Sequence, residues 1–215
     1  VQEAFAHQMD DICRMEEYDA IGLGRDGGTN GEHSAIVYKK DKFILLDKGD
    51  FWYSQTPDVP GKGWDATCCN RICSWGKFKE RASGKVFFFF NSHFDHQGKV
   101  ARRESSKLLL QRIREIAKGY PVLSVGDYNA EPDSEPMMIL VQSGELLNSY
   151  ETSQTPPYGT SGTFHNYKHQ GPFERRIDHI LHSAGISVLK YATLNETPGG
   201  RFPSDHYPVM VEVEF

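Results

Sequence analysis

Apolar residues recur at helical spacing in three stretches of the chain. They predict helices over residues 5–17, 100–118 and 134–142. In the middle helix, Leu109, Ile113 and Ile116 form the apolar stripe that should face the core. Its opposite side should be solvated, and it carries the arginines at positions 102, 103, 112 and 114.

Alternating or continuous apolar runs predict strands between these helices. We expect them over residues 18–24, 32–38, 43–47, 70–78, 85–92, 122–125, 177–182, 186–192 and 209–215. A charged turn at 39–42 predicts that the second and third of these strands pair as a hairpin. The aromatic, proline-rich stretch 51–64 and the stretch 151–170 are expected to be mostly irregular.

The order of these elements predicts an α/β (α+β) fold. A helix comes early, hairpins follow, one long helix lies between two strands, and hairpins return towards the end. This order favours two mixed, mostly antiparallel sheets packed face to face with helices outside. No Pro/Ser/Gly-rich linker interrupts the 215 residues, so we expect a single domain over 1–215. We expect it to be a monomer.

Composition narrows the choice of partners. The hydrophobic content of 38%, with thirteen Phe and ten Tyr, is enough for a sizeable core. The net charge is −5, and no Lys/Arg block is present, so tight nonspecific binding to nucleic-acid phosphates is not favoured. An acidic balance fits a site that gathers carboxylates around a cation.

The spacing of the cysteines argues against a zinc knuckle and against a disulfide-rich fold. Cys13, Cys68, Cys69 and Cys73 lack the paired spacing of a zinc knuckle and do not form a disulfide framework. We expect them to be packing residues, with a single bridge involving Cys13 left open. No apolar run reaches the roughly eighteen residues that a membrane span needs. The sequence starts at Val1 without a recognisable signal peptide, as a fragment or a processed product would, so the compartment stays open.

One stretch, residues 121–132, carries the strongest chemical signal. An apolar run ends abruptly at Gly126 and is followed by Asp127, Asn129 and a proline-containing turn. A carboxylate and an amide presented together at a strand end can orient a water and stabilise a developing charge. A strand followed by an ordinary Asx-type turn explains this stretch alone equally well.

Other polar groups also fall at the ends of predicted segments, which favours the chemical interpretation. They are Glu3, Glu32, His93, Asp178, Asp205 and His206. Carboxylates are ligands for a hard cation, while amides and histidines can meet phosphoryl oxygens. Gathered at one rim, these side chains would suit a metal ion beside a phosphate ester.

At these positions the chain resembles the endonuclease/exonuclease/phosphatase superfamily, which includes deoxyribonuclease I, inositol polyphosphate 5-phosphatases and deadenylases. The resemblance rests on short motifs in order: Gln2-Glu3, Asn91-Ser92-His93, Gly126-Asp127-Tyr128-Asn129, Arg176-Ile177-Asp178-His179 and Ser204-Asp205-His206. The runs 31–36, 51–52 and 91–96 resemble a bacterial branch whose substrate is unassigned.

The resemblance implies a four-layer α/β/β/α sandwich and hydrolysis of a phosphate ester that depends on Mg²⁺ or Mn²⁺. By motif, the metal carboxylates would be Glu3 and Asp205. Asp127 would activate the attacking water, and Asn129 would bind the scissile phosphate. The phosphate-facing groups would be His93, His206 and Arg71.

Two carboxylates would support those histidines. Asp178 would face His206, and Glu32 would pair with His93. Carboxylate partners should raise the pKa values of both histidines and favour their donor form. Glu3 also has an ordinary explanation, as an acid favoured by the dipole of the following helix.

The chain departs from the family pattern at one point. Family members carry an Asn on a core strand upstream of the Gln-Glu pair, and this chain has no such strand, so an exposed strand edge is expected. Our first prediction is a phosphodiesterase or phosphatase that acts on a small or flexible ester. Two alternatives stay open: a nuclease acting on DNA or RNA, and a non-catalytic binding protein on the same scaffold.

Overall fold

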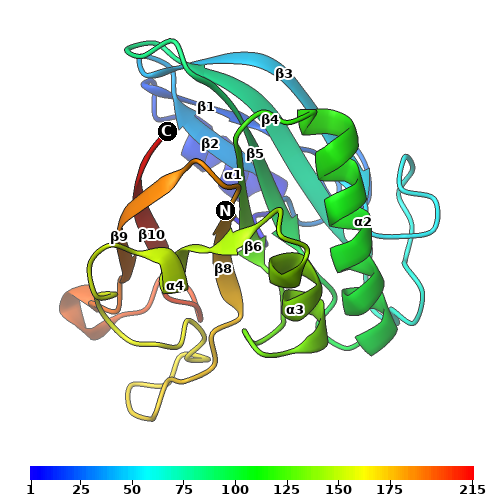
Figure 1. The fold of residues 1–215 in the computed structure, drawn as a ribbon. Helices are drawn as coiled ribbons and strands as arrows, with labels where there is room; N and C mark the ends of the chain where they lie inside the picture. Colours follow the sequence, from blue (N-terminus) through cyan, green and yellow to red (C-terminus); the bar gives the residue numbers. More distant parts are fainter.

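The centre of the molecule is a six-stranded mixed sheet (Figure 1). The computed structural model describes residues 1–215, apart from the side chain of Pro198. Across the sheet the strands are β3 (Phe43–Trp52), β4 (Ile72–Glu80), β5 (Val86–His93), β6 (Val122–Asp127), β8 (Asp178–His182) and β7 (Leu147–Asn148). Only the β5–β6 pair is parallel among the described strands of this sheet.

Two small antiparallel sheets and several helices complete the fold. The small sheets are β1 (Tyr18–Ile21) with β2 (Ile36–Lys39), and β9 (Ser187–Thr193) with β10 (Val209–Glu214). The helices are α1 (Ala6–Cys13), α2 (Lys99–Ala117), α3 (Glu135–Gln142), the short α4 (Ser149–Thr152) and a 3₁₀ turn, η1 (Pro198–Gly200). In Figure 1, α2 and α3 lie on one side of the large sheet, and β9 and β10 lie on the other. The predicted mixed α/β class is confirmed.

The four consecutive phenylalanines of β5 explain why the large sheet is covered on both faces. Phe88 and Phe90 belong to the core beneath α2 and α3, where Leu109 of α2 also packs. Phe87 belongs to a second core, and Phe89 packs against it. Because successive strand residues point to opposite faces, a continuous apolar run stabilises a strand only where both faces are buried.

A hydrophobic groove of about 820 Å³ lies between the second face of the large sheet and the two small sheets. Its lining includes Tyr38 of β2, Phe87 and Phe89 of β5, and Val213 of β10. Within the described residues, β2 pairs only with β1, and β10 pairs only with β9. Residues of β2 and β10 therefore border the groove, and the further strand that the family pattern implies stays a prediction.

Two local predictions were wrong. Residues 32–38 and 43–47 do not form a hairpin, because β2 pairs with β1 while β3 pairs with β4. The charged turn between them instead carries the chain from one sheet to another. The aromatic residues Phe51 and Trp52 belong to the end of β3 rather than to an irregular segment. Local patterns identify strands, but pairing is decided by tertiary packing.

The cysteines also differ from expectation. Cys68 and Cys69 form a disulfide with each other, whereas Cys13 is exposed and free and Cys73 is buried and free. The expectation that the cysteines are packing residues therefore holds only for Cys73. None of the helices that the structure describes has the length and apolar character needed to cross a membrane.

Candidate functional site

Three predicted site residues occupy one row across the large sheet. His93, the last residue of β5, is in register with Asp127, the last residue of β6, and Asp127 is in register with Asp178, the first residue of β8. Gly126 makes this close approach possible. A Cβ there would lie 2.0 Å from the carbonyl oxygen of Ser92, and its φ of 148° disfavours other residues.

Asp127 and Asn129 form a compact pair after β6. The backbone N–H of Asn129 donates to Oδ1 of Asp127 at 2.8 Å, and the Asn129 amide donates to the carbonyl of Phe94 at 3.0 Å. Asn129 has φ 47°, a left-handed conformation that Asn tolerates better than most residues. Burial, with the nearby charge of Asp178, raises the pKa of Asp127 to about 7. A carboxylate with that pKa can accept a proton near neutral pH.

His206 is held against Asp178. Its Nδ1 lies 2.7 Å from Oδ2 of Asp178, the oxygen that also accepts a 2.5 Å hydrogen bond from the Thr163 hydroxyl. Burial lowers the pKa of His206, but the hydrogen bond and charge of Asp178 outweigh it and raise this pKa to about 9. The imidazole is therefore cationic at neutral pH, as the sequence predicted for this residue.

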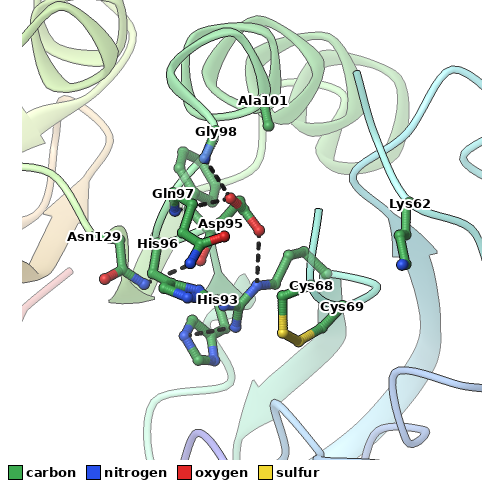
Figure 2. Close-up of polar contacts among 12 residues, drawn as sticks. Lys62, Cys68, Cys69, His93, Asp95, His96, Gln97, Gly98, Ala101 and Asn129 are labelled. Carbon is green, nitrogen blue, oxygen red and sulfur yellow. Dashed lines mark hydrogen bonds and ion pairs between the residues drawn. A yellow bond between two sulfur atoms is a disulfide. The ribbon is translucent and has the colours of Figure 1, made fainter. Parts of the chain in front are cut away.

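Arg71 binds the other histidine of the motif. One terminal nitrogen lies 2.8 Å from Nε2 of His93, and the other lies 2.7 Å from Nδ1 of His96. Asp95 faces its Nε at 3.7 Å. Figure 2 shows Asp95 beneath Gln97 and Gly98, whose N–H groups donate to its Oδ1. The buried guanidinium is thus fixed from three sides.

The environment of His93 corrects one expectation. Burial lowers the pKa of His93 well below its ordinary value, and the charge of Arg71 lowers it further. His93 is neutral and accepts a hydrogen bond from Arg71 through Nε2, although Asp127 lies 3.5 Å away. The prediction that carboxylates raise its pKa was wrong, because burial disfavours the cationic ring and Arg71 adds a positive charge beside it.

Glu32 also has a partner that the sequence did not indicate. It accepts a 2.5 Å hydrogen bond from Arg25, although we expected it to pair with His93. It nevertheless remains in the cluster, since Glu3, Glu32 and His93 each place one ligand atom within 4.8 Å of the others. Its charge therefore pairs with Arg25 and repels the neighbouring carboxylate of Glu3.

The predicted metal carboxylates face a common cavity. Glu3 and Asp205 line it together with Asp127, Asp178 and His206, and its volume is about 320 Å³. Burial raises the pKa of Glu3, and the negative charges of Glu32 and Asp205 raise it further. Glu3 also has φ 61°, an uncommon conformation for this residue type. Mutually repelling carboxylates on a strained backbone fit a divalent cation, since a bound cation would offset their repulsion.

Sequence reasoning missed several supporting residues. Thr163 and Arg25 lie in loops without periodicity, so no signal pointed to them. His96 and Asp95 were visible beside His93 in the 91–96 run, but only the fold brings them to Arg71. Gln2 donates to Asn91 at 2.6 Å, which joins the first motif to the end of β5.

Comparison with known proteins agrees with this geometry. A model of the endonuclease/exonuclease/phosphatase family matches residues 2–206. The chain belongs to this family. Members of the family are hydrolases that act on phosphoester bonds, and they generally use divalent metals.

Two solved bacterial structures are similar over nearly the whole chain. A mannosyl-6-phosphatase of Bacteroides thetaiotaomicron is 44% identical, with a TM-score of 0.94, over 100% of this chain and 84% of that one. A family protein of Bacteroides vulgatus is 36% identical, with a TM-score of 0.94, over 99% of this chain and 82% of that one.

The curated relatives that it matches are considerably longer than this chain. An uncharacterized protein of Acanthamoeba polyphaga mimivirus is 33% identical over 100 residues, which are 45% of this chain and 37% of that protein.

Proposed function

We propose that this protein is a metal-dependent phosphatase that releases inorganic phosphate from the phosphate monoester of a small cyclic alcohol, such as a hexose. The observation that carries the proposal is the convergence of a basic carboxylate, a cationic histidine and clustered acids on one cavity. Asp127, His206, Glu3 and Asp205 all line it. Each is a group that phosphoryl transfer to water requires.

Asp127 is the proposed general base. Its raised pKa suits it to take a proton from a water that attacks phosphorus, and Asn129 holds its Oδ1 through a backbone N–H. In this reaction a new P–O bond forms to the water, and the P–O bond to the alcohol oxygen breaks on the opposite side. The leaving oxygen takes a proton from solvent, and Asp127 returns the proton it accepted to solvent. Fixing the carboxylate in advance removes the need to orient it during the reaction.

Two cationic groups are available for the charge that develops on the phosphoryl oxygens. His206 is held by Asp178, and Arg71 is held by His93, His96 and Asp95. Preorganised donors of this kind stabilise a transition state more than a ground state, because they are aimed where charge increases. Asn129, whose amide donates to the Phe94 carbonyl, would be a further contact to the phosphate.

Glu3 and Asp205 would hold the divalent cation, with Glu32 as a nearby acid. A bound Mg²⁺ or Mn²⁺ would neutralise phosphate charge and polarise the ester. Two carboxylates are the usual protein contribution to a Mg²⁺ site, since the remaining ligands are waters and substrate oxygens.

The substrate class is supported by likeness and by size. The similar Bacteroides thetaiotaomicron structure is described as a mannosyl-6-phosphatase. The cavity of about 320 Å³ is at the small end of ligand sites, which span roughly 300–1,000 Å³. The net charge of −5 disfavours a long polyanion.

The test is a substrate panel with Mg²⁺, comparing the wild-type protein with Asp127→Asn. The panel holds a hexose 6-phosphate, a bis-aryl phosphodiester, single-stranded RNA and duplex DNA. We expect phosphate release from the hexose 6-phosphate to exceed turnover of the other substrates, and to fall at least about a hundredfold in the variant. A nuclease would instead prefer RNA or DNA, and a non-catalytic binding protein would turn over nothing. Either result would refute the proposal.

A further inference from the structure

The side chain of Tyr167 is an exposed aromatic group on the wall of the catalytic cavity. The cavity that Glu3, Asp205 and His206 line is also lined by Tyr167, which comes from the long segment between α4 and β8. Tyr167 is 57% exposed. An aromatic ring that stays in solvent contributes little to folding stability. Its position beside clustered acids therefore suggests a role in binding.

The backbone at this position is unusual. Asn166 and Tyr167 have φ values of 50° and 57°, so two consecutive residues other than glycine adopt the left-handed conformation. This conformation costs on the order of 1 kcal/mol or more per residue for side chains with a Cβ. Such a turn persists only where the surrounding structure holds it.

The turn is held by the same segment that carries the catalytic residues. The backbone N–H groups of His165 and Asn166 both donate to the carbonyl of Asp205, at 3.0 and 3.1 Å. The His165 ring is 2% exposed and lies between Phe202 and Tyr207, at centroid distances of 4.1 and 4.3 Å. These contacts hold the turn that carries Tyr167 against the Asp205 backbone.

We infer that Tyr167 is a specificity-determining residue that packs its ring against the cyclic alcohol of the substrate while the phosphate occupies the cavity. The inference rests on the proposed function and names the group that selects the substrate. Sugar rings present C–H groups on one face, and an aromatic side chain offers a flat apolar surface to them. A phosphate ester of an open-chain alcohol has no such face.

The charged groups of the cavity cannot supply this selection. Glu3, Asp127, Asp205 and His206 would all meet the metal, the water or the phosphate, which every substrate of the enzyme shares. Discrimination between alcohols therefore has to come from side chains farther out. Among the cavity-lining residues, Tyr167 is the aromatic one.

The test compares a hexose 6-phosphate with glycerol phosphate, which lacks a ring, in wild type, Tyr167→Ala and Tyr167→Phe. In Tyr167→Ala we expect kcat/KM for the hexose ester to fall roughly tenfold relative to glycerol phosphate, mainly through KM. Tyr167→Phe keeps the ring and should keep the wild-type ratio of the two substrates. The matched control is Tyr158→Ala, since Tyr158 is 60% exposed but bonds to Glu196; it should also keep that ratio.

The outcomes separate this inference from the proposed function. Equal losses on both substrates in Tyr167→Ala, with an unchanged melting temperature, would overturn the role of Tyr167 and leave the phosphatase assignment intact. A wild-type protein that hydrolyses neither substrate would overturn the proposed function, and the inference with it.

Discussion

Asp178 binds His206 through a single 2.7 Å contact between a carboxylate oxygen and Nδ1. The two residues are far apart in the sequence, and an antiparallel bridge between Phe164 and His206 helps to bring them together. The same oxygen of Asp178 accepts from Thr163, so the carboxylate cannot rotate without losing two hydrogen bonds. The cationic His206 is therefore presented to the cavity in one orientation.

Removing the charge of Asp178 tests this arrangement. In Asp178→Asn the amide is nearly isosteric but no longer stabilises a cationic ring. We expect kcat to fall at least about tenfold while KM changes less, because the contribution of His206 is greatest in the transition state. Steady-state kinetics on a hexose 6-phosphate measure this split. Asp41→Asn, in an exposed turn, is the control; a wild-type kcat in Asp178→Asn would refute the role.

The planar guanidinium of Arg71 should strengthen the binding of phosphate. Its two terminal nitrogens reach His93 and His96, which a lysine cannot reproduce with one ammonium. In Arg71→Lys we expect inhibition by inorganic phosphate to weaken about tenfold. The control is Arg103→Lys on the solvated side of α2. Equal inhibition constants in Arg71→Lys and wild type would exclude a phosphate contact.

Removal of divalent metal should abolish turnover. We expect EDTA to stop phosphate release and added Mg²⁺ or Mn²⁺ to restore it. Binding can be followed without activity, because a cation bound to the folded state raises its melting temperature. That rise should occur in wild type and shrink in Glu3→Gln, which loses one proposed ligand. Turnover that survives chelation would contradict the metal site.

His179 should make stability depend on pH. It is buried, its Nε2 contacts the Ala130 carbonyl at 2.9 Å, and burial lowers its pKa from 6.5 to about 4. Between these values the unfolded chain binds a proton that the folded chain excludes. The contribution of His179 to stability is therefore fully present above pH 6.5 and is lost as the pH drops towards 4.

Denaturant titrations across this pH range measure the effect. The expected loss from this one group is on the order of 3 kcal/mol. His179→Gln keeps a donor near Ala130 but does not titrate, so its free energy of unfolding should fall less steeply. Identical slopes in the two proteins would show that His179 does not contribute.

The sequence predicted most of the elements, and which polar side chains the fold brings together, better than the residues that support them. Asp127, Asn129 and Asp178 could be placed together from the sequence because each follows or begins a strand whose apolar pattern is clear, and strand ends in one sheet meet at one rim. Their catalytic roles stay predictions. Thr163 and Tyr167 were missed because they lie in a loop whose conformation is set by backbone hydrogen bonds to residues 205–207. No local pattern encodes that dependence.

Pairing and electrostatics were the other failures, and both are tertiary properties. The β2–β3 hairpin was inferred from a turn, but the two strands have separate partners in different sheets. His93 was expected to be cationic because acids lie near it in the motif set. The fold instead buries the ring, which lowers its pKa, and the charge of Arg71 lowers it further.

Hydrolysis in water enriched in ¹⁸O tests the central claim most directly, since the account requires a water activated by Asp127 to attack phosphorus. With a hexose 6-phosphate and Mg²⁺, mass spectrometry should find one ¹⁸O in each released phosphate and none at the C6 oxygen of the sugar. Label at the C6 oxygen would place the attack at carbon and contradict the account.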